Sequence, residues 1–242
     1  MRVLVISDIH GNLPALDAVI QDAGLIDAAW CLGDVVGYGP NPNECIERVR
    51  TLPNSICILG NHDAAALGQI DLQTFNREAR FSARWTQDHL NPDSLAFLRN
   101  LPEIVEYGEV TLTHGSPRNP VWEYLLDTNT ATVNFEYFDT KICLVGHTHL
   151  PIAYYAVNGN HKTEWKIIQV GEPTKITGRA ILNPGSVGQP RDHDPRAAYG
   201  IYDPVENIWE AHRLSYDISE VQKRIYAAGL PPRHAIRLGE GW

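Results

Sequence analysis

The sequence predicts an α/β fold. Near the N-terminus, short apolar runs of the length that forms strands buried on both faces alternate with segments of helical periodicity. Several of these runs end in a glycine beside Asp, Asn or His, and open α/β sheets place their sites at the carboxyl ends of strands. The last third instead has the hairpin pattern of antiparallel strands. We therefore expect one α/β sandwich that combines parallel and antiparallel strands.

The first sixty residues carry the strand–helix alternation. The spacing of Leu16, Val19 and Ala23 gives one apolar stripe of a helix, which Gly24 ends. The predicted elements are, in order, a strand over 3–6, a helix over 13–24, a strand over 28–32, a helix over 43–52 and a strand over 55–59. This order and spacing require right-handed crossovers and a parallel sheet.

The rest of the chain adds an insertion and a set of hairpins. Helices are predicted over 74–90 and 94–100, and we interpret residues from about 70 to 100 as a helical insertion. The further elements are predicted strands over 104–107, 110–113 and 142–145, a helix over about 130–138, strands over 153–157, 165–170, 180–182, 197–202 and 208–214, and a helix from Asp217 or Ser219 to 228. Asn158-Gly159 is a hairpin-turn signal. The tail after Pro231-Pro232 is expected to be loose. No linker divides the chain, so residues 1–242 are predicted to form a single domain in which 150–242 complete the second sheet.

Composition excludes several classes of function. A net charge of −9 disfavours general binding to nucleic acid or to an anionic membrane, each of which requires a basic face. The sequence shows no signal peptide and no stretch long enough to cross a membrane. The four cysteines form no C-x-x-C pair, which is typical of reduced thiols in a cytoplasmic protein. We expect a cytoplasmic protein, and the sequence leaves the oligomeric state open.

One set of residues at five strand ends carries the chemistry: Asp8, His10, Asp34, Asn61, His62, His114, His147 and His149. Five of the ten histidines fall in this set, although a structural histidine in a core is normally solitary. Two carboxylates and several imidazoles suit Zn, Mn, Fe, Co or Ni. The set is too rich in nitrogen for Ca or Mg and too large for one tetrahedral zinc.

These motifs, D-x-H, G-D, G-N-H-D, H-G and G-H-T-H in this order over residues 7–149, resemble those of the calcineurin-like metallophosphoesterases. The resemblance implies a four-layer sandwich of two mixed sheets flanked by helices, with two divalent metal ions. It implies Asp8, His10, Asp34 and His149 on one ion, and Asp34, Asn61, His114 and His147 on the other. His62 would face the substrate as the catalytic residue. Two such ions can activate water to a hydroxide nucleophile and clamp the reacting oxygens.

Departures from the protein-phosphatase pattern indicate which branch of the family the sequence resembles. Gly37 and Tyr38 stand where those enzymes have an Asp that pairs with the histidine and an Arg that holds a phosphate monoester. The segment Asn183-Pro184-Gly185-Ser186 and its continuation to Arg191 resemble the small bacterial and archaeal phosphodiesterase branch. We therefore predict a phosphodiesterase acting on a small phosphorylated substrate.

Some residues keep two interpretations. Arg191 would contact phosphate or lie in a solvated loop, and Asn12 would touch substrate or, more in keeping with its position, cap a helix. Asp63 would orient His62 or cap the next helix. Trp122 and Tyr124 would line a pocket for a base or aryl group, or belong to the core. His193 is expected to be an exposed loop residue.

Three other functions remain as rivals to the phosphodiesterase. Within the same fold the chain would be a dinucleoside-polyphosphate hydrolase or a phosphomonoesterase, whereas a nuclease acting on long polymers is disfavoured by the acidic charge. Outside enzymes, it would be a metal-free scaffold. The complete ligand set and His62 favour the enzyme.

Overall fold

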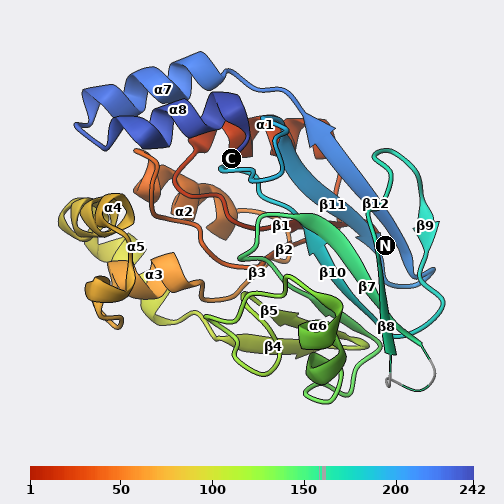
Figure 1. Cartoon of the computed structure of the whole chain (residues 1–242). Coiled ribbons are helices and arrows are strands. Elements are labelled where there is room, and N and C mark those ends of the chain that lie inside the picture. The colour runs from red at the N-terminus through yellow and green to blue at the C-terminus, as the bar shows by residue number, and fades with distance from the viewer. Residues whose placement is uncertain (158, 160–161) are drawn as a thin grey trace.

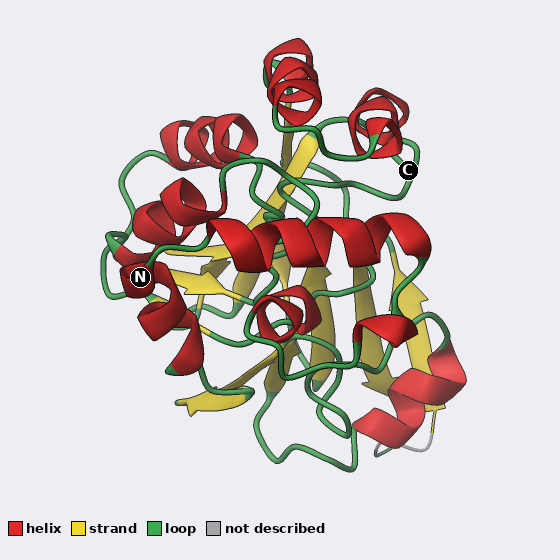
Figure 2. Ribbon diagram, turned by 90° about the vertical axis from the view of Figure 1, so that its left-hand side faces the viewer, coloured by secondary structure: helices red, strands yellow, loops and turns green. Residues whose placement is uncertain are grey.

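The described chain forms four layers. The structure is a computed structural model, and it describes residues 1–157, 159 and 162–242. Two mixed six-stranded sheets pack face to face, and helices lie on their outer faces (Figure 1). Figure 2 shows many of the helices above and in front of the strands. This is the sandwich that the resemblance implied.

The first sheet holds the N-terminal alternation. Its strands in spatial order are β3 (Ile56–Cys57), β2 (Ala28–Cys31), β1 (Val3–Ile6), β11 (Ala197–Asp203), β12 (Ile208–Leu214) and β9 (Thr174–Lys175). β3, β2 and β1 are parallel, because each pair of successive strands is joined by a crossover through a helix, and β11 joins β1 antiparallel. All four residues of β1 are buried, because the strand is covered on both faces.

The second sheet is centred on three parallel strands. In spatial order its strands are β4 (Ile104–Tyr107), β5 (Val110–Thr113), β6 (Ile142–Leu144), β10 (Ala180–Pro184), β7 (Pro151–Val157) and β8 (Lys162–Lys166). β5, β6 and β10 are parallel, so their carboxyl ends meet at one edge. The core between the two sheets includes Trp30 and Trp209 from the first sheet and Leu112 and Leu182 from the second.

Apolar sides of helices pack against the outer face of each sheet. The described helices are α1 (Leu13–Ala23), α2 (Pro42–Arg50), α3 (Asn61–Ala66), α4 (Arg77–His89), α5 (Pro92–Arg99), α6 (Thr128–Asn134), α7 (Ile218–Ala227) and α8 (Pro232–Glu240), with a 3-10 turn at Leu72–Thr74. Leu16 and Val19 of α1 are buried with Leu4 and Ile6 of β1 on the outer face of the first sheet. Phe135, which ends α6, is buried with Val145 on the outer face of the second.

The strands of the last third divide between the two sheets rather than building the second alone. β7, β8 and β10 join the second sheet, whereas β9, β11 and β12 join the first. β8 spans Lys162–Lys166, so most of the strand expected over 165–170 lies outside a strand. The expected turn at Asn158-Gly159 includes residue 158, which lies outside the described residues.

The expectation of a loose tail is wrong. Pro232 stands in the first turn of α8, where proline is well tolerated, and Gly241 ends the helix in the left-handed conformation. Ala235 and Leu238 are buried against Val221 and Ile225 of α7. The proline pair separates two helices instead of ending the ordered chain.

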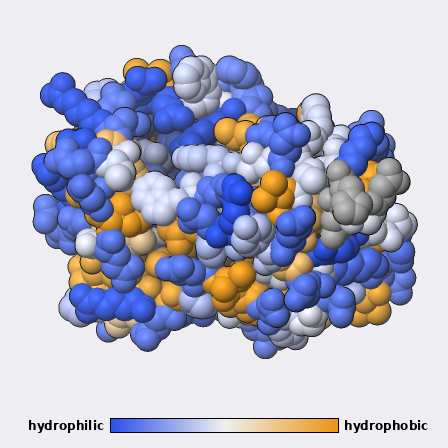
Figure 3. Space-filling view, turned by 60° about the horizontal axis from the view of Figure 1, so that its bottom comes forward, coloured by the Kyte–Doolittle hydropathy of each residue, from blue (hydrophilic) through white to orange (hydrophobic). Residues whose placement is uncertain are grey.

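Neither the surface seen in Figure 3 nor the described helices have a long continuous apolar region. On the face seen in Figure 3, apolar side chains lie in small groups among polar ones. Among the described residues, no helix is both long and apolar enough to span a membrane.

Candidate active site

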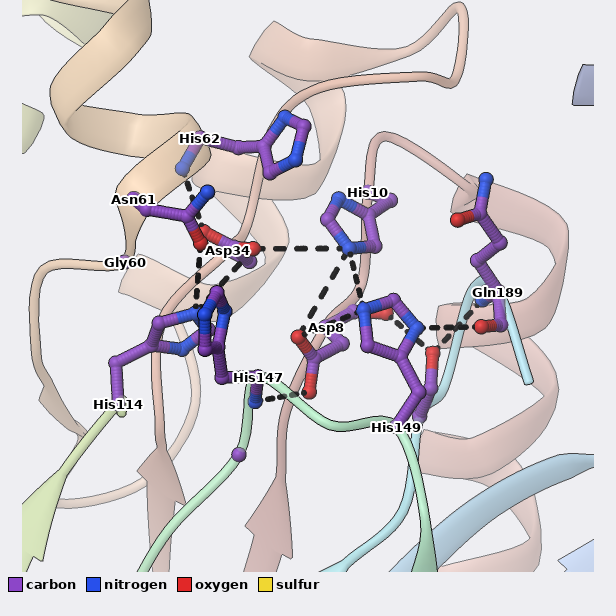
Figure 4. Close-up of polar contacts among 12 residues, drawn as sticks. Asp8, His10, Asp34, Gly60, Asn61, His62, His114, His147, His149 and Gln189 are labelled. Carbon is purple, nitrogen blue, oxygen red and sulfur yellow. Dashed lines mark hydrogen bonds and ion pairs between the residues drawn. The ribbon is translucent and has the colours of Figure 1, made fainter. Parts of the chain in front are cut away.

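Loops that follow the strands of both sheets bring the predicted residues together (Figure 4). Five of these residues have positive φ: Asp8 (55°), His10 (52°), Asp34 (54°), His147 (63°) and His149 (62°). Positive φ is uncommon for residues other than glycine, and such conformations cluster at functional sites. The backbone is therefore bent to aim these side chains at one centre.

The first donor group is formed by Asp8, His10 and His149. Nε2 of His149 lies 3.3 Å from Oδ1 of Asp8 and 3.3 Å from Nε2 of His10. Nε2 of His10 lies 3.8 Å from the same Asp8 oxygen. One carboxylate oxygen and two ring nitrogens thus converge on one point.

The second donor group is formed by Asp34, His114 and His147. Nε2 of His114 lies 3.3 Å from Oδ2 of Asp34 and 3.1 Å from Oδ1 of Asn61. The same Asp34 oxygen lies 3.7 Å from Nε2 of His10, in the first group. Oδ2 of Asp34 therefore stands between the two groups.

The backbone fixes which ring nitrogen each histidine presents. Nδ1 of His10, His114 and His149 lies at the carbonyl oxygens of Val36, Leu32 and Gln189 respectively, and Nε2 of His147 lies at the carbonyl of Trp122. A carbonyl only accepts, so each of these nitrogens carries the proton when the ring is neutral. The other nitrogen then offers its lone pair to the centre, which is the arrangement of metal-bound histidines.

The inward-facing oxygens lack partners. Oδ1 of Asp8 and Oδ2 of Asp34 are buried and accept no hydrogen bond from the described residues. Their second oxygens are used, since Asp8 accepts from the His147 amide and Asp34 from the His62 amide. The free Oδ1 of Asp8 faces the lone pairs of His10 and His149, which is costly without a cation between them. The residues present therefore fit divalent metal ions.

The pKa values of the buried groups also indicate that a positive charge is stabilised at this centre. Burial raises the pKa of Asp8 to about 7. For Asp34 burial also acts upward, but His114 and His62 outweigh it and hold the pKa well below its ordinary value. Burial acts to lower the pKa of His114, yet Asp34 raises it to about 9. A proton on His114 thus takes the position that a cation would take beside Asp34.

His62 lies next to both groups and, with His10 and Asp34, forms a third set of ligand atoms close enough together to hold a metal ion. Its ring is 4.9 Å from that of His10 and 4.4 Å from that of Tyr38. Burial lowers the pKa of His62 to about 4, so the ring is neutral at pH 7 before an anion binds. Gly37 is required beside it, because a Cβ there would lie 2.6 Å from Nδ1 of His62 and the glycine has φ of +90°. The Asp of the protein-phosphatase pattern does not fit this backbone.

A cleft of about 660 Å³ opens onto Asn61 and His62. Trp122 and Tyr124 line it, which favours the pocket interpretation of these two residues over the core interpretation. Arg191 lines it as well, with Nη2 on the side-chain oxygen of Gln189 at 3.2 Å.

The remaining predicted residues have structural contacts. Asn12 caps α1 by accepting from the amide of Ala15, and its Nδ2 donates to the carbonyl of Gly188 and to the hydroxyl of Tyr216. Its polar atoms are occupied, so we assign it no substrate contact.

Asp63 accepts from the amides of Val36 and Gly60 and so holds the start of α3, which is the capping interpretation. His193 is exposed, as expected.

Sequence reasoning missed two groups of residues that line the cleft. Phe75 follows the 3-10 turn and Arg77 begins α4, whereas Arg233, Arg237 and Trp242 come from α8 and the residues after it. The signal in the tail is the four-residue spacing of the two arginines beside Ala235 and Leu238, which places them together on an amphipathic helix.

We expect the metal-free protein to lose stability as the pH falls from about 6.5 to about 4. Five buried imidazoles have pKa values lowered chiefly by burial: His10, His62, His147, His149 and His234. A group with a lowered folded pKa contributes stability above its unfolded pKa and loses it as the pH falls. Asp8 and Asp63, whose pKa values burial raises to about 7, act oppositely but are only two. Urea unfolding with a chelator at the two pH values measures this, and equal or greater stability at the lower pH would contradict it.

The comparisons with known proteins agree with this geometry. A solved metallophosphoesterase from Sphaerobacter thermophilus superposes with a TM-score of 0.92 at 45% identity, over 100% of this chain and 99% of that one. An uncharacterized protein from Methanocaldococcus jannaschii is 39% identical over 95% of this chain and 93% of its own length. Phosphodiesterase YfcE of Escherichia coli is 27% identical over 84% of this chain and 88% of its own.

The model of a known protein family matches most of the chain. The calcineurin-like phosphoesterase superfamily domain matches residues 1–207, which include all the residues of both donor groups as well as Asn61 and His62. The chain belongs to the calcineurin-like phosphoesterase superfamily.

Proposed function

We propose that this phosphoesterase is a phosphodiesterase that acts on a small phosphorylated substrate with two divalent transition-metal ions. The single observation that supports this most strongly is the free Oδ2 of Asp34, which lies 3.7 Å from Nε2 of His10 and 3.3 Å from Nε2 of His114. One oxygen shared by two donor groups is what a bridging ligand requires. The family relation to YfcE favours a diester.

In this proposal each donor group holds one ion. Asp8, His10, Asp34 and His149 hold the first, and Asp34, Asn61, His114 and His147 the second. Mn, Fe, Zn, Co and Ni all suit this mixture of imidazole and carboxylate. When bound, such ions polarise the phosphoryl oxygens and lower the pKa of water at the site.

The protein's own residues then bind and orient the ester. Arg191 lies at the cleft and carries the charge that a phosphoryl group demands. His62 can donate one N–H to a phosphoryl or leaving oxygen while neutral. A bound phosphoryl anion favours its protonated form, so His62 is the candidate general acid for a poor leaving group.

Two features favour a diester over a phosphomonoester. The arginine that grips the monoester in the protein-phosphatase pattern is replaced by Tyr38, which is buried and packs edge-on against His10 at 4.7 Å. Gly37 leaves no side chain to pair with His62. A phosphomonoester carries a second negative charge at the reacting phosphorus, which a diester lacks. The site therefore has fewer side chains that could bind this second charge.

We also propose that the protein works in the cytoplasm. All four cysteines are free and buried, which suits a reducing compartment. The net charge of −9 supports a small substrate rather than a long nucleic acid.

The test is a comparison of bis-nitrophenyl phosphate with nitrophenyl phosphate, using protein loaded with Mn²⁺ and protein treated with a chelator. We expect the diester to be hydrolysed faster and both activities to depend on metal. Faster hydrolysis of the monoester would favour the phosphomonoesterase rival. A protein that binds no Mn²⁺ and hydrolyses neither compound after incubation with Mn²⁺ would favour the scaffold.

A further inference from the structure

The cleft beside the donor groups is strongly basic, although the protein as a whole is acidic. Its lining includes four arginines: Arg77, Arg191, Arg233 and Arg237. Among the residues that the structure describes, only Arg233 of these four has an Asp or Glu side chain within ion-pair distance, at 3.8 Å from Glu78. A concentration of guanidinium groups next to a candidate catalytic centre indicates a site for anions.

Arg191 and Arg237 line the same cleft as Asn61 and His62. Burial, then Arg191, lowers the pKa of Arg237, and Arg233 acts in the same direction. Arg237 therefore lies in the fields of both Arg191 and Arg233.

Two of these arginines are held in place by hydrogen bonds to oxygen atoms. Nε of Arg237 donates to the main-chain oxygen of Trp242, and Arg191 donates through Nη2 to Gln189. Nε of Arg191 is buried and has no hydrogen-bond partner among the described residues. These contacts orient the guanidinium groups and leave several of their N–H donors for a ligand.

Aromatic rings share the same cleft. Phe75, Trp122, Tyr124 and Trp242 all line it, and the rings of Tyr124 and Trp242 are about half exposed. Tyr124 stacks on His147 with 3.7 Å between ring centroids, so an exposed ring face lies next to the donor groups. Exposed aromatic faces beside arginines are the usual means by which proteins hold a nucleobase.

The outer part of the cleft lies beyond the residues that the family model matches. The superfamily domain ends at residue 207, whereas Arg233, Arg237 and Trp242 come from α8 and the residue pair after it. α8 is fixed against α7 by its buried Ala235 and Leu238. The reacting residues thus belong to the family, and part of the neighbouring cleft is supplied by the tail.

We propose that this cleft binds a nucleoside polyphosphate, with one phosphoryl group at the donor groups, at least one more on Arg191 and Arg237, and the base against the aromatic rings. This assignment specifies the substrate class for the proposed phosphoesterase reaction, but the binding can be measured without any hydrolysis.

The test compares three ligands that are not cleaved between phosphorus atoms: AMP, α,β-methylene-ADP and methylenediphosphonate. Calorimetric titration into the Mn²⁺-loaded protein should show that α,β-methylene-ADP binds at least tenfold more tightly than either of the others. Equal binding of AMP would show that no second phosphoryl site exists. Equal binding of methylenediphosphonate would show that the base is not recognised. Either result overturns the proposal.

Substitution identifies the arginine. Arg237→Gln should remove most of the advantage of α,β-methylene-ADP over AMP, a loss of about 10–100-fold in Kd, because a charge-assisted hydrogen bond disappears. Arg99→Gln changes an exposed arginine at the end of α5 and should keep the full advantage. An unchanged ratio in Arg237→Gln would overturn the role of α8. If the wild-type protein fails to hydrolyse bis-nitrophenyl phosphate, the proposed reaction is wrong, while these binding ratios still decide the ligand.

Discussion

Asp34→Asn should reduce phosphodiester hydrolysis by roughly 10³-fold or more, which is the largest loss that we expect from one substitution in this chain. Oδ2 of Asp34 lies within 3.7 Å of a histidine from each donor group. Replacing the carboxylate by an amide removes the negative charge that both proposed ions share. The reaction therefore loses both the charge balance and the relative placement of the two ions.

Metal content should fall along with activity. We expect mass spectrometry of the purified protein to show about two ions per chain in the wild type and at most one in Asp34→Asn. Asp88→Asn is the matched control, because Asp88 is exposed on α4 and makes no contact with the site. Full metal content together with full activity in Asp34→Asn would refute the bridging role.

His62→Ala should give a loss that depends on the leaving group. A nitrophenolate leaves without a proton, whereas an alkoxide or a ribose oxygen requires one. General acid catalysis contributes about 10²–10⁴-fold, so we expect a loss in this range for an alkyl or nucleoside diester and a small loss for bis-nitrophenyl phosphate. Metal content should remain at the wild-type value, because His62 lies outside the proposed ligand sets.

The low pKa of His62 sharpens this expectation. Burial places the pKa at about 4 in the free protein, so the proton must come with substrate binding. An equal loss on both diesters would assign His62 to holding the phosphoryl group through one neutral N–H. Loss of a metal ion would make His62 a ligand.

The sequence predicted the fold class because its signals there are local. Apolar runs such as 3–6 and 110–113 are short and end in glycine-containing loops, and these runs are strands in the structure. The residues of the donor groups could be named for the same reason, since each follows a strand end. Their convergence depends on the sheets, which bring Asp8 and His149 to 3.3 Å although 141 positions separate them in the sequence.

The parts that could not be predicted depend on contacts between distant segments. The order of α8 comes from the packing of Ala235 and Leu238 on α7, and proline residues before a helix look like the end of a structured region in sequence. The position of β8 is set by its pairing with β7, where Tyr154 lies opposite Trp165, and not by the apolar run after residue 165. The basic cleft was missed because it combines the start of α4, the strand-end loops and α8.

Anomalous X-ray diffraction from crystals grown with Mn²⁺ tests the central claim most directly. The account predicts two peaks about 3.5–4 Å apart, with Asp34 between them. One peak should contact Asp8, His10 and His149, and the other Asn61, His114 and His147. A single peak in this cluster, or Mn²⁺ bound only elsewhere on the protein, would contradict the account.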